Sequence, residues 1–191
     1  MWIPPALQAP APLPSPAPWW SEKGGLGLEP VGEASFARLG VPYVVEGFHA
    51  DGRALRRLGL RGKTALWRAL STGQVASGCR LRFLVFLGAD KRRAFFEQSL
   101  PRFWPDAHFS MARKDVKAFL ERVCRPIEPG FQQDYLFLPD RSLWVRMGDE
   151  APVHFPKGPL VEALRRIEWE EDPDTPGTMD RLLQGYAERH P

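Results

Sequence analysis

A ten-residue stretch that reads CRLRFLVFLG, from Cys79 to Gly88, constrains the fold of this chain more than any other segment. Residues 83–87 are all apolar, and the run is too short to stand alone as a helix. Apolar runs of this length form strands that are buried on both faces of a sheet. We therefore predict that Cys79–Gly88 is a central strand, followed by a tight turn and a helix whose first N–H groups are capped by Asp90.

The patterns on either side of this stretch predict the fold class. Residues 41–48, 135–138 and 143–147 are typical of strands, and Pro139-Asp140 between the last two predicts a β-hairpin. Residues 53–59 suit either a helix or a return strand, of which we favour the strand, while 116–123 has the spacing of an amphipathic helix. The sequence thus predicts an α+β fold, with a mixed or antiparallel sheet of about four or five strands and helices mainly on one face.

The length of 191 residues and a hydrophobic content of 43% suit one domain with appendages. Residues 1–40 are predicted to be a proline-rich extended arm and linker, because seven prolines between 1 and 20 disfavour both helix and internal strand. We predict a single α+β domain at 41–168. An acidic, proline-broken linker and a small C-terminal helix are predicted at 169–191.

Composition restricts the class of protein. No run of eighteen apolar residues is present and the early prolines do not fit a secretory signal, so we expect a cytoplasmic location and no membrane partner. Cys79 and Cys124 are expected to be buried free thiols, and two cysteines cannot build a tetrahedral metal site without histidine help, so we predict no cofactor. The lack of asparagine and the arginine to lysine ratio of 20 to 6 fit a thermophile with a GC-rich genome.

Charge is strongly segregated along the chain. Residues 50–125 contain 17 Lys or Arg against 6 Asp or Glu, whereas residues 126–191 contain 7 against 13. A basic block of this size either attracts a polyanion or pairs with the acidic block inside the fold or in a dimer. Charge by itself does not separate these alternatives.

The basic block leads to our first functional hypothesis, a small non-catalytic protein that binds DNA, RNA or another polyanion. Several cations stand near helix starts, where they oppose the helix dipole unless an anion uses them. A solvated basic face without such a partner is the alternative. The candidate nucleic-acid-binding residues are Arg53, Arg56, Arg57, Arg61, Lys63, Arg68, Lys91, Arg92, Arg93, Arg113 and Lys114.

A second hypothesis comes from a short motif. Pro105-Asp106 followed by Asp115-Val116-Lys117 resembles the PD-(D/E)xK pattern of metal-dependent nucleases. This resemblance implies that Asp106 and Asp115 hold Mg²⁺ while Lys117 steadies the attacking water or the developing phosphate charge. In that family the second part of the motif lies on a strand, whereas here it lies in a segment with helical periodicity.

A third hypothesis is a protein-interaction adaptor. Residues 1–20 favour an extended polyproline conformation, and Trp2, Trp19 and Trp20 could either lie across the core or occupy the aromatic groove of a protein partner. Under this hypothesis the acidic C-terminal segment holds a second partner.

Overall fold

The computed structural model describes residues 17–23, 26–38, 41–60, 62–169 and 177–189. None of the helices in these ranges is long and apolar enough to cross a membrane. In chain order the elements are α1 (Pro18–Glu22), β1 (Leu28–Arg38), β2 (Val41–Asp51), α2 (Gly52–Arg57), α3 (Lys63–Ser71), β3 (Ser77–Phe83), α4 (Ala89–Phe103), α5 (Lys114–Val123), β4 (Gln132–Phe137), β5 (Leu143–Met147), β6 (Val153–Phe155), α6 (Pro159–Trp169) and α7 (Thr178–Arg189).

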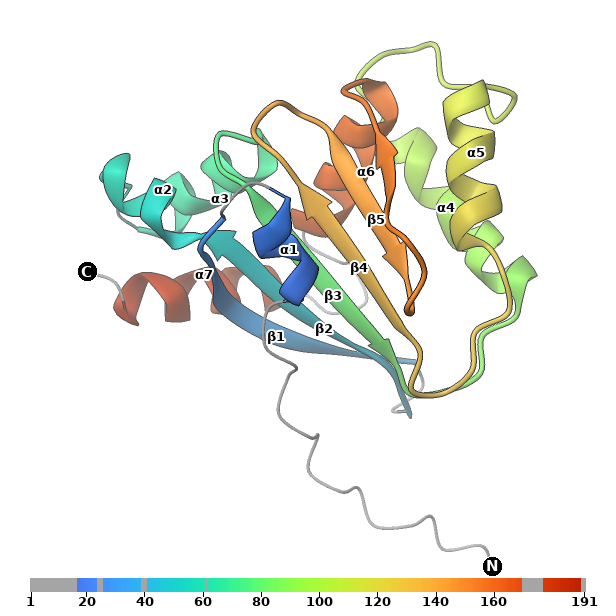
Figure 1. Ribbon diagram of the computed structural model, residues 1–191, viewed down its shortest axis with the longest axis horizontal. Helices are drawn as coiled ribbons and strands as arrows, with labels where there is room; N and C mark the ends of the chain where they lie inside the picture. Colours follow the sequence, from blue (N-terminus) through green and yellow to red (C-terminus); the bar gives the residue numbers. More distant parts are fainter. Residues whose placement is uncertain (1–16, 24–25, 39–40, 61, 170–176, 190–191) are drawn as a thin grey trace, which may run out of the picture.

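The strands form one sheet in the order β1-β2-β3-β4-β5-β6, and every neighbouring pair is antiparallel (Figure 1). The predicted α+β fold is confirmed, with six strands among the described residues. The predicted hairpin around Pro139-Asp140 is present as β4 and β5. The prediction of a return strand at 53–59 is wrong. The side chain of Asp51 accepts a hydrogen bond of 3.1 Å from Ala54 N and caps the start of helix α2 in this segment.

The sheet extends into the segment that the sequence assigned to an arm and linker. Strand β1 pairs with β2 from Leu28 opposite Asp51 to Arg38 opposite Val41, with register shifts near Pro30 and Phe36. These irregularities break the alternating pattern that identifies a strand in the sequence. At the other end of the chain, α7 packs on β1 and buries Met179, Leu183 and Tyr186.

Strand β3 lies between β2 and β4, so the prediction of a central strand is correct in place and wrong in length. Phe83 is its last residue, and beyond it the chain leaves the sheet; Leu87 makes only an isolated bridge with Ile127. The side chain of Phe86 is 55% exposed, which is incompatible with burial on both faces. Helix α4 begins after Gly88, and Asp90 lies in its first turn without capping it.

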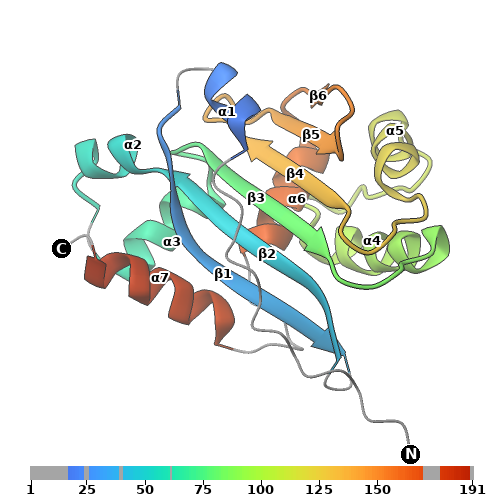
Figure 2. The same ribbon diagram turned by 60° about the horizontal axis from the view of Figure 1, so that its bottom comes forward.

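The two faces of the sheet are covered differently (Figures 1 and 2). Helices α3, α4, α6 and α7 lie on one face, where the main hydrophobic core includes Phe48, Cys79, Tyr135 and Val145. The short helix α1 lies on the opposite face. Trp19 and Trp20 of α1 are buried there in a smaller cluster with Leu28, Ala76 and Leu136.

Helix α1 corrects the view that residues 1–20 cannot form a helix, since Pro18 occupies the first turn, where its missing N–H is tolerated. Trp19 Nε1 donates a hydrogen bond of 3.0 Å to Asp134 Oδ2, and Asp134 pairs with Arg80 at 3.1 Å. The indole ring of Trp20 lies flat against Gly78, where an added Cβ atom would be 2.9 Å from the ring. The absence of a side chain at 78 therefore makes room for Trp20.

We expect Gly78→Ala to destabilise the protein by about 1–2 kcal/mol, because the new methyl group overpacks against the buried indole. The free energy of unfolding in urea, measured for Gly78→Ala, Trp20→Ala and the double variant, checks this. The cost of Gly78→Ala should largely disappear in the Trp20→Ala background, since the ring it displaces is gone. Additive effects of the two substitutions would contradict the proposed contact.

Candidate functional site

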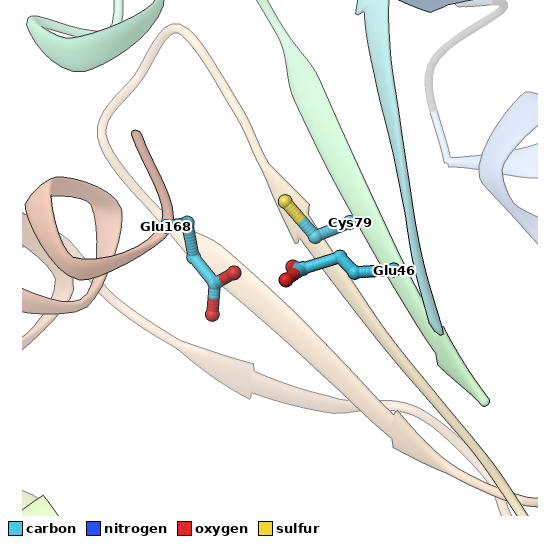
Figure 3. A group of neighbouring side chains, drawn as sticks. All are labelled: Glu46, Cys79 and Glu168. Atoms are coloured by element: carbon cyan, nitrogen blue, oxygen red, sulfur yellow. The ribbon is translucent and has the colours of Figure 1, made fainter. Parts of the chain in front are cut away.

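Three polar side chains meet inside the main core, on the face of the sheet that the helices cover (Figure 3). Glu46 comes from β2, Cys79 from β3 and Glu168 from the last turn of α6. One oxygen or sulfur atom from each residue lies within 4.8 Å of the other two. Glu46 is 6% exposed and Cys79 0% exposed, while Glu168 is half-buried. We call these three residues the Glu–Cys–Glu cluster.

Strand pairing and the anchoring of α6 hold the cluster in place. Phe48 is the cross-strand partner of Cys79, so Glu46, two residues before Phe48, points to the same face of the sheet. Trp169 fixes the end of α6 on that face, since its indole nitrogen donates to Ser77 Oγ at 3.2 Å and its carbonyl accepts from Trp67 Nε1 at 2.9 Å. Glu168, the residue before Trp169, is thereby brought to Cys79.

Burial dominates the electrostatics of the cluster. It raises the pKa of the Cys79 thiol well above its usual value, and the neighbouring carboxylates of Glu168 and Glu46 raise it further. Burial also raises the pKa of Glu168, against the effect of its hydrogen bonds with Glu46 and Cys79. The cluster therefore favours proton-carrying, hydrogen-bonded forms of these groups.

A second buried polar group adjoins the cluster. Arg92 of α4 donates from Nε to the Val123 carbonyl at 2.7 Å and from Nη2 to Gln133 Oε1, and Gln133 in turn donates to the Tyr135 hydroxyl. Tyr135 is the cross-strand partner of Cys79. None of the ion pairs among the described residues involves Arg92, and burial lowers the pKa of its guanidinium group. These contacts tie α4 to α5 and to strand β4 through neutral acceptors.

Two hollows lie at the edges of the sheet. One, of about 320 Å³, is formed by β1 and α7. The other, of about 590 Å³, is formed by α5 and β6, and we call it the α5–β6 hollow. Its lining residues are Arg113, Lys114, Asp115, Ala118, Val153, His154, Phe155 and Pro156.

The structure separates the basic residues that were predicted to bind nucleic acid. Helices α2 and α3 lie at one end of the sheet and α4 and α5 at the other (Figures 1 and 2). Arg92 is buried, and Arg61 lies outside the described residues. The set is distributed as follows: Arg53, Arg56 and Arg57 on α2, Lys63 and Arg68 on α3, Lys91, Arg92 and Arg93 on α4, and Arg113 and Lys114 at the start of α5.

Several members of this set are engaged by acidic side chains of the same chain. Three ion pairs are formed: Arg56 with Glu29 at 2.8 Å, Lys63 with Asp180 at 2.6 Å, and Arg113 with Asp115 at 3.1 Å. The pair of Lys63 and Asp180 joins the basic block to the acidic C-terminal block, which is one of the two explanations that the charge segregation left open. Part of the basic block is thus neutralised inside the fold.

The nuclease hypothesis is wrong. Asp115 and Lys117 lie on helix α5, where the nuclease pattern requires a strand, and Asp115 pairs with Arg113. Asp106 accepts a hydrogen bond of 2.7 Å from the backbone N–H of His108 and closes a local turn. The only group of three possible metal ligands among the described residues is the Glu–Cys–Glu cluster, which includes none of these positions.

Comparisons with known proteins show a likeness to solved structures. No protein-family model matches the chain, and no curated protein matches it. Among solved structures, the chain is similar to a fatty-acid binding protein of Arabidopsis thaliana, with a TM-score of 0.61 and 17% sequence identity. The similarity covers 85% of this chain and 87% of the other. At this level of identity the likeness establishes a shared fold.

The prediction of a nucleic-acid-binding protein with DNA or RNA as its partner is wrong: the similar structure is described as a fatty-acid binding protein, and the basic residues of this chain do not form one surface. The division of the basic residues between the two ends of the sheet gives the physical reason. The adaptor hypothesis is overturned as well: Trp19 and Trp20 are buried against the sheet and cannot enter a partner's groove, and Trp2 lies outside the described residues.

His49 is a buried titratable residue on the face of the sheet that α1 covers. Its imidazole lies on β2 against the Trp20 ring, with ring centres 5.2 Å apart. Burial lowers the pKa of His49 from 6.5 to about 4; a hydrogen bond with the Gly47 backbone opposes this effect, and the charge of Arg80 adds to it. The folded protein therefore holds His49 neutral at a pH where the unfolded chain protonates it.

We expect this difference to weaken the fold by about 2–3 kcal/mol as pH falls from 7 to 4.5, since the unfolded state binds the extra proton. Urea unfolding at both pH values should show a smaller loss for His49→Phe, which keeps an aromatic ring against Trp20 and removes the titration. Protonation of carboxylates should weaken the wild type and the variant equally, so it cancels when the two losses of stability are compared. Equal losses for wild type and variant would contradict the assignment.

Proposed function

We propose that the protein binds a fatty acid or a similar small amphiphile, with a carboxylate head and an apolar tail, in the α5–β6 hollow. The observation that carries the proposal is the hollow itself, whose volume of about 590 Å³ is within the range of small-molecule sites. Ala118, Val153 and Phe155 provide an apolar wall, and cationic groups stand at the start of α5. This combination suits a ligand with one charged end.

The head group would lie at the start of α5. Arg113, the N-cap residue, gives the helix no side-chain cap, so N–H groups of the first turn can receive an anion. Lys114 follows Arg113, and it takes part in none of the ion pairs among the described residues. Asp115 neutralises part of the charge of Arg113. Lys114 and the helix start are therefore the main attraction for a carboxylate.

The tail would cover apolar surface at the edge of the sheet. Strand β6 is the last strand of the sheet, and its Val153 side chain is 37% exposed. Phe155, on the same strand, is buried against Phe119 of α5, with ring centres 5.8 Å apart. A tail placed along these residues would extend the hydrophobic core, and each Å² of apolar surface removed from water contributes about 25 cal/mol.

The comparison supports this proposal, because the structurally similar protein is described as a fatty-acid binding protein and the likeness covers most of both chains. The proposed role is binding without covalent chemistry. A cytoplasmic location stays a prediction from the sequence, to be checked by cell fractionation.

Titration calorimetry with dodecanoate tests the site. We expect binding to wild type, a loss of about 5- to 20-fold in affinity for Lys114→Ala, and weaker binding of dodecanol, which lacks the charge. Lys91→Ala is the matched control, because Lys91 lies in the first turn of α4, away from the hollow, and its replacement should leave the affinity unchanged. Failure of dodecanoate to bind, or equal affinity for dodecanoate and dodecanol, would contradict the proposal.

Ala118→Trp tests the tail region separately. Ala118 is exposed on α5 and lines the hollow, so a large side chain there should fill it and weaken both dodecanoate and dodecanol. The urea midpoint should stay close to that of wild type, which separates a filled site from a damaged fold. Undiminished binding of both ligands would place them elsewhere.

A further inference from the structure

We propose that Glu46, Cys79 and Glu168 form a binding site for a borderline-soft divalent cation of the Zn²⁺ type. This proposal is independent of the amphiphile site, which lies between α5 and β6. It starts from the position of three possible metal ligands that belong to three different elements, β2, β3 and α6, and converge inside the core (Figure 3).

The geometry is close to that of a bound ion. The three ligand atoms lie within 4.8 Å of one another. Ligands bonded to one tetrahedral zinc ion lie about 3.5 Å apart, so inward movement of about 1 Å closes the site. Glu46 and Glu168 have flexible side chains that allow this movement, whereas Cys79 is held by strand pairing on both sides of β3.

The donor set indicates the class of metal. One thiolate and two carboxylates combine a soft ligand with two hard ones, a combination that Zn²⁺ and Co²⁺ accept and that Mg²⁺ and Ca²⁺, which prefer oxygen alone, do not. Three protein ligands leave the fourth position of a tetrahedral ion for water. Because Glu168 is half-buried while the other two are buried, the open position would face the Glu168 side.

The charges around the cluster give a second, independent reason. Glu168 takes part in none of the ion pairs among the described residues. Arg165, one turn earlier on α6, interacts electrostatically with Cys79, while its hydrogen bond of 2.9 Å goes to the Leu138 carbonyl and its guanidinium group stacks on Phe137. The ionised forms of buried acidic groups, which are the forms that bind metal, are costly unless a cation compensates them. A divalent ion bound by the three side chains would supply that compensation.

Cobalt titration of the full chain tests the site. We expect one Co²⁺ per chain, with the near-ultraviolet absorption of a thiolate-to-cobalt charge transfer, and displacement of Co²⁺ by Zn²⁺ but not by excess Mg²⁺. Cys79→Ser should abolish the absorption. Glu46→Gln and Glu168→Gln, which keep the shape and hydrogen bonding of the carboxyl groups, should each weaken Co²⁺ binding at least about tenfold.

Cys124→Ser is the matched control, because Cys124 is the other free thiol and does not belong to the cluster. It should retain the absorption and the affinity. Lys114→Ala should also bind Co²⁺ like wild type, so a failure of the metal proposal is distinguishable from a failure of the amphiphile proposal. No charge-transfer absorption in wild type, its persistence in Cys79→Ser, or unchanged affinity in both glutamine variants would overturn the proposal.

Discussion

The packing of one face of an antiparallel sheet beneath a layer of helices is the constraint on which the rest of the structure depends. Side chains alternate along each strand, so Phe48, Cys79 and Tyr135 point into the same core, while His49, Gly78 and Arg80 face α1. The helices that cover this face are held there by the apolar side chains that they bury against the sheet. The end of α6 is a clear case, since Trp169 is anchored on Ser77 of β3.

The same packing determines the state of the polar groups enclosed with the apolar ones. Most side chains on the helix-facing side are buried, so Glu168 and Cys79 bond to each other and Arg92 bonds to neutral oxygens of Val123 and Gln133. The three ligand atoms of the Glu–Cys–Glu cluster lie within 4.8 Å of one another, whereas the basic residues are divided between the two ends of the sheet. This is why the Glu–Cys–Glu cluster, and not the charged surface, gives the more specific chemical proposal.

The fold was partly predictable because strand and helix periods are local properties. The hairpin at 135–147 and the helix at 116–123 were identified correctly from patterns of a few residues. Strand β1 was missed because register shifts and glycine interrupt its alternation, and α2 was misassigned because Arg53–Gly59 fits both periods. The prediction of a nucleic-acid-binding surface failed for another reason. The density of charged residues along the sequence does not show which cations are buried, as Arg92 is, or paired with an acidic side chain, as Lys63 is.

The sequence by itself determined the α+β class and the position of the central strand, because these follow from hydrophobic periods within single segments. Only the tertiary structure decided which polar residues meet. Glu46 and Glu168 lie in segments with no shared motif, and neither carries a local signal for the other. Their approach depends on strand pairing and on the anchoring of α6, and such long-range contacts cannot be read from neighbouring residues along the chain.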